Sequence, residues 1–382
     1  MAMPAERLSS LDAFRGLAIA SMVLVNNPGD WAHLHPPLAH AAWHGWTFTD
    51  LVFPWFLFAA GLAMPISLGR RAAAGDDKAG LLASTAKRAA IIFLVGLALN
   101  FIPDFDLATI RIPGVLQRIA LCVLVAAPFV IWGGWRSALA GALAFLAVHS
   151  VGLLAIPVAD ANGLIAAGAL EPGRDFGSRI DRAVFGPHLW AKAKTWDPEG
   201  LWGTLPATAS LLAGVIAGHF VTAARPARKA PWLFASGAFF LVLGWMFDAA
   251  LLPINKNLWT ASYAVFMTGW TLVALAAFHA AMDEAGTGTR RAARRLAQPL
   301  TIYGMNALFL FAFSGLVARA LNAIKVAGAD GNPVALKAAL FAPFRALPVS
   351  PENASLAWAI AFNLAMFAVA VFLWRRRWFI KA

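Results

Sequence analysis

The chain has 382 residues, of which 60% are hydrophobic and only 13% are charged, and its mean hydropathy is +0.68. A soluble domain carries about 25% charged residues, so this composition excludes a soluble globular protein and indicates a polytopic membrane protein embedded in a lipid bilayer. The formal net charge of +12 does not indicate nucleic-acid binding, because the basic residues flank apolar segments and form no stripe of their own.

The single cysteine and the N-terminal segment bear on disulfides, metal sites and targeting signals. Cys122 is the single cysteine, so the sequence excludes an intrachain disulfide and a cysteine-based metal site. Residues 1–10 are polar, and the apolar stretch after them has no small-residue cleavage site. We therefore expect no cleaved signal peptide.

Ten segments have the length and apolar character of membrane-spanning helices, each of which needs about 20 residues. We predict an all-α bundle that forms a single transmembrane domain over residues 1–382. The predicted spans are 12–30, 48–69, 88–102, 112–131, 137–156, 203–222, 231–251, 259–281, 298–321 and 354–374. The spacing Gly214-x-x-x-Gly218 predicts close packing of one span against a neighbour.

Lysine and arginine are distributed unevenly between the segments that connect these spans. If the N-terminus is inside, the inner segments hold 19 basic residues and the outer segments hold 10. Basic residues collect on the cytoplasmic side of a membrane protein, so we predict that both termini are cytoplasmic. The long loops 157–202 and 323–353 are then extracytoplasmic.

Amide, imidazole and carboxylate side chains are concentrated between the first two predicted spans. Polar groups at a membrane boundary are costly, so this cluster is the first candidate for a functional site. Asn26 and Asn27 end the first span, and since one residue suffices as a helix cap, Asn26 is the better functional candidate. His40 and His44 share a face if that stretch is helical, and Asp50 begins the second span.

Each of these residues also has a structural interpretation. The two histidines have no Glu or third ligand nearby in a metalloprotease arrangement, so we predict no metal site. Taken alone, His40 and the surrounding tryptophans fit ordinary packing at the membrane interface. Asp50 is favoured at a helix N-terminus by the helix dipole, and it would fix the tautomer of His40 if it also contacts that ring.

Polar side chains also occur in the outer half of several later helices. Arg118 follows Gln117 inside the span 112–131, near the limit of snorkelling. It is expected to face a polar interior and to pair with an acid, such as Asp248, or with a ligand anion. Other polar residues open or interrupt later spans, as a shared cavity would require, namely Asp197, Asn255, Lys256, Trp259 and Asn306.

Taken together, these segments resemble the heparan-α-glucosaminide N-acetyltransferase family and, within it, the bacterial NagX-type members. The resemblance covers essentially the whole chain, and its motifs are specific jointly, although none is specific alone. The segments are Arg7-Leu8-x-Ser10-Leu11-Asp12-x-Phe14-Arg15-Gly16, Val25-Asn26, His40-Ala41-x-Trp43-x-Gly45, Asp50-Leu51-Val52-Phe53-Pro54, Arg111-x-Pro113-Gly114-Val115-Leu116-Gln117-Arg118, Asp197-Pro198-Glu199-Gly200, Pro253-x-Asn255-Lys256-Asn257-Leu258-Trp259 and Gly304-Met305-Asn306.

The resemblance implies a transmembrane acetyltransferase that uses acetyl-CoA from the cytoplasmic side and acetylates a glucosamine amine on the far side. The family's catalytic histidine corresponds to His40 and its motif asparagine to Asn26. His44 departs from the lysosomal members, which carry an amide there. The sequence shows neither their long lumenal N-terminal region nor an eleventh span, so we do not expect the heparan substrate to carry over. The resemblance also suggests a homodimer and a place in the bacterial inner membrane.

The chemistry of acetyl transfer agrees with these residues. An amine that attacks a thioester needs a base near neutral pH, for which His40 is suited, and an oxyanion donor, for which Asn26 is suited. His40 can instead accept the acetyl group itself in a two-step route, and the sequence does not choose between the routes. With Asp50 as a third catalytic residue, the expected acceptor-binding residues are His44, Gln117, Arg118, Asp197, Asn255, Lys256, Trp259 and Asn306.

Charge alone locates the donor site. The phosphates of CoA are expected near inner basic residues, namely Arg70, Arg71, Lys87 and Arg88. Two other functions fit the same composition. Polar residues within spans and a broken first helix are also typical of a sugar transporter, although the two halves of the chain do not repeat each other. O-acylation of a cell-surface glycan is the third alternative.

Overall fold

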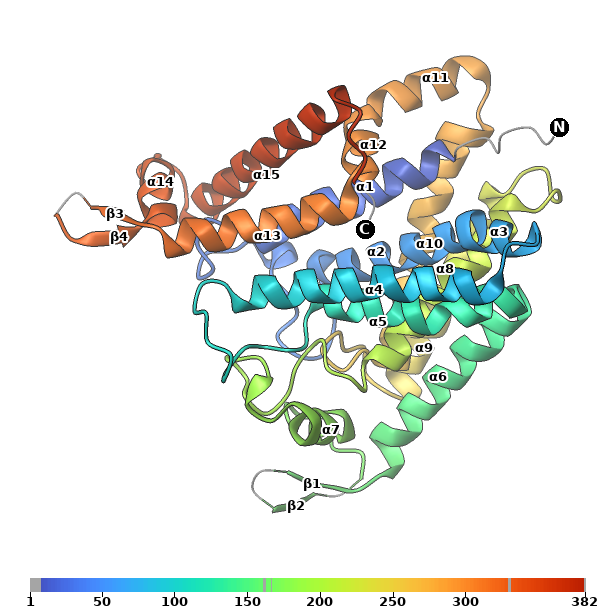
Figure 1. Cartoon of the computed structure of the whole chain (residues 1–382), viewed down its shortest axis with the longest axis horizontal. Coiled ribbons are helices and arrows are strands. Elements are labelled where there is room, and N and C mark those ends of the chain that lie inside the picture. The colour runs from blue at the N-terminus through green and yellow to red at the C-terminus, as the bar shows by residue number, and fades with distance from the viewer. Residues whose placement is uncertain (1–7, 161–162, 166, 329–330, 381–382) are drawn as a thin grey trace.

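The computed structural model describes residues 8–160, 163–165, 167–328 and 331–380, most of which are helical (Figure 1). The helices are α1 (Ser9–Asn26), α2 (Phe48–Met64), α3 (Arg70–Ala73), α4 (Lys78–Phe101), α5 (Val115–Pro128), α6 (Trp135–Ala155), α7 (Phe176–Phe185), α8 (Thr204–Thr222), α9 (Ala230–Ala250), α10 (Ala261–His279), α11 (Thr287–Leu296), α12 (Gln298–Met305), α13 (Ala307–Ala323), α14 (Leu336–Arg345) and α15 (Pro351–Arg375). Two antiparallel hairpins pair β1 (Val158–Asp160) with β2 (Gly163–Ile165) and β3 (Lys325–Ala327) with β4 (Pro333–Ala335).

The predicted helical membrane bundle is confirmed. Among the described residues, eight helices are long and apolar enough to cross a membrane, and the total is nine if α12 and α13 form one span with its 81° bend. These nine correspond to nine of the ten predicted spans. The remaining predicted span, 12–30, forms α1. This helix is less apolar than the other nine, because it carries Asp12 and Arg15 in its first turns.

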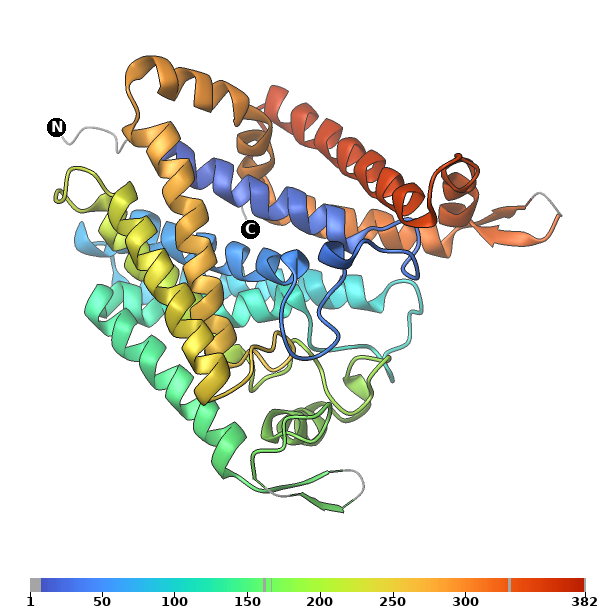
Figure 2. The same cartoon turned by 180° about the vertical axis from the view of Figure 1, so that it is seen from behind.

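Helix α1 is nevertheless central to the bundle. Twelve of its residues are buried, including Asp12, whose carboxylate lies 2.9 Å from a guanidinium nitrogen of Arg15. The start of α1 and the end of α15 lie on one side of the bundle, because the two helices run in opposite directions (Figures 1 and 2). The N–H of Gly29, just after α1, donates to the carbonyl of Ser355, near the start of α15, at 3.2 Å. This arrangement fits the predicted common side for both termini, while its assignment to the cytoplasm stays a prediction.

The small residues predicted to allow close helix packing do so between α8 and α2. A β-carbon added at Gly214 would lie 2.1 Å from the carbonyl oxygen of Phe58, and one at Gly218 would lie 2.5 Å from that of Leu62. Any side chain at these two positions would therefore push the helices apart. This packing holds the first turn of α2, which carries Asp50, against the centre of the bundle.

The two long loops contain more structure than expected. The loop 157–202 includes the hairpin β1–β2 and α7, and the loop 323–353 includes the hairpin β3–β4 and α14. Both groups lie away from the start of α1 (Figure 1). The apolar periodicity of membrane spans did not reveal these short elements, because their helices and strands are three to ten residues long.

Candidate functional site

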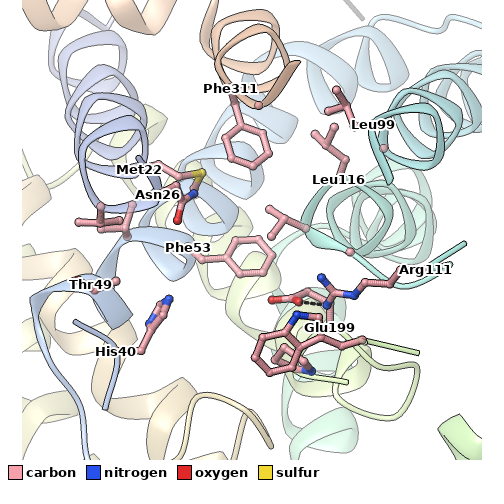
Figure 3. A pocket seen from close by; sticks show the side chains of 18 of the residues that line it. Met22, Asn26, His40, Thr49, Phe53, Leu99, Arg111, Leu116, Glu199 and Phe311 are labelled. Atoms are coloured by element: carbon pink, nitrogen blue, oxygen red, sulfur yellow. Dashed lines mark hydrogen bonds and ion pairs between the residues drawn. The ribbon is translucent and has the colours of Figure 1, made fainter. Parts of the chain in front are cut away.

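A cavity of about 690 Å³ opens where α1 ends and where α2, α5 and the segment after α7 begin (Figure 3). Its walls combine apolar side chains from the helices with polar side chains from the connecting segments. The polar lining residues are Asn26, Asn27, His40, Thr49, Asn100, Arg111, Gln117, Lys192, Glu199, Lys256, Asn257, Ser314 and Arg319, and three tryptophans, Trp31, Trp190 and Trp196, complete the lining. A large hollow with convergent polar groups is the usual form of a small-molecule site.

His40 and Asp50 form a pair at one wall of this cavity. The Nδ1 atom of His40 lies 2.6 Å from Oδ1 of Asp50, and the other carboxylate oxygen accepts from the backbone N–H groups of Ala41 at 3.1 Å and Thr47 at 3.0 Å. Asp50 occupies the first turn of α2, where the helix dipole favours a carboxylate. The contact favours the tautomer with the proton on Nδ1, which leaves Nε2 as the basic nitrogen.

The two side chains of this pair differ strongly in their exposure to solvent. The carboxylate side chain of Asp50 is 1% exposed, whereas the imidazole of His40 is 46% exposed and lines the cavity. The hydroxyl of Tyr263 donates to the backbone carbonyl of Asp50 at 2.6 Å and so holds the first turn of α2 from the far side. The carboxylate is thus immobilised behind the imidazole, and the imidazole faces the space in which a substrate would lie.

The two asparagines at the end of α1 have different surroundings. The carboxamide of Asn27 is buried and donates to the carbonyl of Val23 at 2.7 Å, so Asn27 serves its own helix end. Asn26 is exposed and lines the cavity on the same side as His40 (Figure 3). Because a helix end needs a single cap, we expected Asn26 to be the better functional candidate, and it is the asparagine with the exposed side chain at the cavity.

An ion-pair cluster forms the opposite wall. The guanidinium of Arg111 contacts both carboxylate oxygens of Asp197, at 2.8 and 2.5 Å, and an oxygen of Glu199 at 2.6 Å. Burial opposes the charge of Glu199, but the guanidinium of Arg111 prevails and lowers the pKa of this carboxyl. Figure 3 shows this wall facing His40 and Asn26 across the cavity.

The sequence of the chain is similar to known proteins that share one description. The sequence profile described as "Heparan-alpha-glucosaminide N-acetyltransferase, catalytic" matches residues 7–177, a region that includes Asn26, His40, Asp50 and Arg111. The mouse heparan-alpha-glucosaminide N-acetyltransferase is 28% identical over 364 residues, which cover 80% of this chain and 53% of that protein. The human protein of the same name is 28% identical over 370 residues, which cover 80% of this chain and 52% of the relative.

The chain is therefore similar to heparan-α-glucosaminide N-acetyltransferases, and the profile match covers its residues 7–177. These similarities support the resemblance that the motifs indicate. The chain spans about half the length of the curated relatives it matches. The NagX-type assignment within the family stays a prediction.

The structure places four of the predicted site residues on this cavity, namely Asn26, His40, Gln117 and Lys256. Others lie behind its walls. Asp50 and Asp197 support His40 and Arg111 as described above. Trp259 is fully buried and packs edge-on against Phe53, which lines the cavity, with 5.2 Å between ring centroids.

Arg118 does not pair with Asp248, so that expectation is wrong. The carboxylate of Asp248 accepts from the backbone N–H of Ile254 at 2.5 Å. Arg118 is buried, donates to the carbonyl of Gly200 at 2.8 Å, and lies 5.3 Å from the ring centroid of Trp259. Its position behind the loop that carries Glu199 indicates that it braces the cavity wall.

Three further residues are placed away from the predicted acceptor contacts. His44 is exposed outside the cavity, and its Nδ1 lies 3.3 Å from the carboxamide nitrogen of Asn255, which is itself buried. Asn306 lies at the bend between α12 and α13. Its carboxamide donates to the carbonyl of Trp378 at 3.0 Å and accepts from the N–H of Ile380 at 2.8 Å, which ties the C-terminal segment to the bundle.

A second cavity of about 510 Å³ lies nearer the start of α4, between the same helices α2, α4, α5 and α13. Arg15 and Arg88 line it, together with Phe379 and Ile380 from the C-terminal segment. Of the four basic residues predicted to contact CoA, only Arg88 is among its lining residues. Arg71 instead pairs with Asp76 at 2.7 Å, and Arg70 and Lys87 are exposed near the same end of the bundle.

Sequence reasoning missed several lining residues of the first cavity. Arg111 and Glu199 stood inside recognised motifs, but the motifs did not indicate which of their residues would face the cavity. Trp190, Trp196 and Arg319 come from segments far apart in the chain and carried no local signal. The described residues contain no group of three or more His, Cys, Asp or Glu side chains that would hold a metal ion.

We expect Asp181, in α7 behind the Arg111 wall, to make stability depend on pH. Burial raises the pKa of Asp181 to about 7, and its carboxylate accepts from the N–H of Leu201 at 2.8 Å. The folded protein then binds this proton more tightly than the unfolded chain, so stability falls as pH rises from about 4 to 7. The free energy of unfolding falls by on the order of 3 kcal/mol over this range. Thermal unfolding of the purified protein at pH 5 and pH 8 measures it.

The matched variants are Asp181→Asn, which keeps an acceptor oxygen for Leu201, and Asp104→Asn, on an exposed loop of the same side. We expect Asp181→Asn to be more stable than the wild type at pH 8 but not at pH 5, whereas Asp104→Asn follows the wild type at both. An unchanged pH dependence in Asp181→Asn would contradict the assignment.

Proposed function

We propose that this protein is an integral membrane N-acetyltransferase that moves an acetyl group from acetyl-CoA to the amine of a glucosamine-type sugar. The observation that carries the proposal is the His40–Asp50 pair, which faces a large polar cavity in a membrane bundle. Similarity to two curated proteins supports the same chemistry, since both are named as N-acetyltransferases of a glucosaminide. Acetyl transfer needs a base, an oxyanion donor and room for two substrates, and the cavity offers all three.

In the proposed reaction, Nε2 of His40 removes a proton from the acceptor amine as its nitrogen attacks the thioester carbonyl carbon. A C–N bond forms, the C–S bond breaks, and CoA leaves as a thiolate that takes up a proton. Asp50 stabilises the positive charge that develops on the imidazole. The carboxamide of Asn26, on the same side of the cavity, supplies a hydrogen bond to the oxyanion.

The two-step route remains an alternative for the same residues. There, Nε2 of His40 attacks the thioester carbonyl carbon, the C–S bond breaks, and CoA leaves as a thiolate that takes up a proton, which gives an acetyl-imidazole. The amine then attacks the acetyl carbon and loses a proton as the neutral imidazole leaves. Incubation of the protein with labelled acetyl-CoA and no acceptor separates the routes. A labelled His40 peptide that forms and decays at the rate of turnover supports the two-step route, and its absence supports direct transfer.

For the donor, we propose the second cavity as the site of the CoA phosphates. It lies at the opposite ends of the helices that line the His40 cavity, on the side where α1 starts. A donor bound there with its acetyl arm between α2, α4, α5 and α13 would reach His40 from the other membrane face. With both termini cytoplasmic, the acetyl-CoA side is the cytoplasm and the acceptor side is extracytoplasmic.

This placement predicts a donor-specific effect of Arg88. We expect Arg88→Gln to raise KM for acetyl-CoA by about tenfold, because a charge-assisted hydrogen bond to phosphate contributes about 1.5–3 kcal/mol. KM for the acceptor should stay unchanged. Initial rates with each substrate varied in turn measure both values.

Lys78→Gln is the matched control, since Lys78 is exposed on the same helix and is not among the lining residues. An equal rise in KM for Lys78→Gln would assign the effect to overall charge and not to the cavity. A rise in the acceptor KM for Arg88→Gln would contradict the proposed place of the donor.

The charge of the His40 cavity bears on the acceptor. Glu199 is paired with Arg111, whereas Lys192 and Arg319 also line the cavity. Neither of these two has a carboxylate ion-pair partner in the described part of the chain. This excess of positive charge favours an amino sugar that carries an anionic group, and the three tryptophans in the wall offer faces on which a sugar ring can stack.

An acceptor screen with the purified protein and labelled acetyl-CoA tests the proposal. We expect N-acetylation of glucosamine and faster transfer to glucosamine 6-phosphate. A hydroxylamine-labile product would identify an ester and favour O-acylation. Uptake of labelled amino sugar into proteoliposomes without acetyl-CoA, with no acetylated product in any assay, would favour the transporter. Homodimer formation and residence in a bacterial inner membrane belong to the proposal through family resemblance alone.

A further inference from the structure

We propose that a cavity beside α11 binds the phosphate headgroup of an anionic phospholipid. The cavity has a volume of about 520 Å³ and lies between α11, the start of α1 and the start of α12. Four of its lining residues are arginines, namely Arg290, Arg291, Arg294 and Arg295. The rest of its lining consists of hydroxyl, amide and thioether side chains, which do not offset this charge.

No carboxylate of the described residues lines this cavity. The two nearest acids in the sequence, Asp283 and Glu284, are engaged by the bundle. The carboxylate of Asp283 accepts from the N–H of Ser10 at 3.3 Å and lies 3.3 Å from His279, and an oxygen of Glu284 accepts from the N–H of Ala230 at 3.1 Å. Asp283 also pairs with Arg294 at 3.3 Å, whereas Arg290, Arg291 and Arg295 have no carboxylate ion-pair partner among the described residues.

The guanidinium groups are arranged for a phosphate. Residues one helical turn apart share a face, so Arg290 lies above Arg294 and Arg291 above Arg295. Arg294 is held in place, because its Nε donates to the carbonyl of Met282 at 2.8 Å and its terminal nitrogen lies 3.3 Å from Asp283. The planar fork of an arginine matches the oxygens of a phosphate with two parallel hydrogen bonds.

The position of α11 favours a lipid over a soluble anion. Two residues separate the membrane-crossing segment Ala261–Glu284 from α11, and one residue separates α11 from the bent span of α12 and α13. Helix α11 must therefore lie at the boundary of the bilayer, at the level of the headgroups. Leu296, at its end, is 86% exposed and offers an apolar contact for the acyl region. Figure 1 shows α11 at the margin of the bundle, standing off from α1.

The phosphates of CoA share this chemistry, but the cavity is not the proposed donor site. Helix α12 separates the two, since Thr301 lines the α11 cavity while Gly304 and Met305 line the donor cavity. The proposal about α11 does not depend on acetyl transfer, and its failure would leave the proposed function untouched.

Binding of short-chain phosphatidylglycerol to the purified full-length protein in neutral detergent tests the proposal. Native mass spectrometry or the lipid-dependent shift in thermal unfolding gives the affinity, with phosphatidylcholine as the zwitterionic reference. We expect Arg291→Gln/Arg295→Gln to bind phosphatidylglycerol roughly thirtyfold more weakly, because each basic side chain near an anionic surface contributes on the order of a fivefold gain. These side chains are exposed and make no hydrogen bond within the described structure, so folding should be preserved.

The matched control is Arg225→Gln/Arg228→Gln, which removes two exposed charges from another segment on the side where α1 starts. This control should keep the affinity of the wild type. Equal losses in the two double variants, or equal binding of phosphatidylglycerol and phosphatidylcholine by the wild type, would overturn the site. Displacement of the lipid by millimolar CoA or inorganic phosphate would assign the cavity to a soluble phosphate and overturn the lipid assignment.

Discussion

His40→Ala is expected to lower the rate of acetyl transfer by about a thousandfold, the usual contribution of a positioned general base. The imidazole lines the cavity and contacts the buried carboxylate of Asp50. Its side chain is 46% exposed, so its removal leaves little packing unfilled and the protein should stay folded. Product formation from labelled acetyl-CoA, together with the thermal unfolding midpoint, separates loss of chemistry from loss of structure.

The same connecting segment offers a matched control for this variant. His33 contacts Asp30 at 2.9 Å, and it is not among the lining residues of the His40 cavity. His33→Ala therefore removes a similar histidine–aspartate pair and should leave the rate within a factor of about two, as expected for a surface substitution. If His40→Ala retains wild-type turnover, or if His33→Ala loses as much, the catalytic role of His40 is wrong.

The second large effect is expected for Asp50→Asn. The backbone N–H groups of Ala41 and Thr47 both point at one carboxylate oxygen of Asp50, so the amide oxygen of asparagine must take that place. Its NH₂ group then faces Nδ1 of His40 and forces the imidazole proton onto Nε2, where it blocks the base. We expect kcat to fall by about 10²- to 10⁴-fold, as for a base held in the wrong tautomer.

A control must separate this effect from damage to the start of α2. Thr47→Val removes the hydroxyl that donates to the carbonyl of Ala39 at 2.5 Å and to Asp50 at 3.2 Å, but it leaves the His40–Asp50 contact. We expect Thr47→Val to lose about 1 kcal/mol of stability with a small change in kcat. Pre-steady-state rates over a range of pH measure the two variants. Equal kcat losses in Asp50→Asn and Thr47→Val would assign Asp50 a purely structural role.

Much of the candidate site was predictable where local sequence carried the signal. A carboxylate in the first turn of a helix and amides at a helix end are local signals, so Asp50 and Asn26 could be named as candidates from the sequence, and their catalytic roles stay predictions. Asn27 was left open between a cap and a functional role, and its carboxamide donates to Val23 of its own helix. His40 followed from the motif around it. Contacts across the bundle were harder to predict, and the expected pairing of Arg118 with Asp248 was wrong, because it depended on how two spans rotate against each other.

The contact between Arg111 and Asp197 in the opposite wall was also not predictable from local sequence. Arg111 and Asp197 are separated by 86 residues, and their contact arises because the segments before α5 and before α8 meet at one end of the bundle. The residues predicted to contact CoA were also only partly predictable from local sequence. Charge counting gave four basic residues at the end of the bundle where the second cavity lies, but only the direction of each side chain on α4 decides that Arg88, and not Lys87, lines that cavity.

The sequence by itself determined a helical membrane bundle and a resemblance to one family, because apolar length and joint motifs are properties of short segments that need no tertiary contact. The tertiary structure alone decided which polar groups converge, and it placed two cavities at opposite ends of the same four helices. The physical reason is that burial in a bundle depends on helix rotation and crossing, and close contacts such as Gly214 against Phe58 set these only when the whole chain has packed.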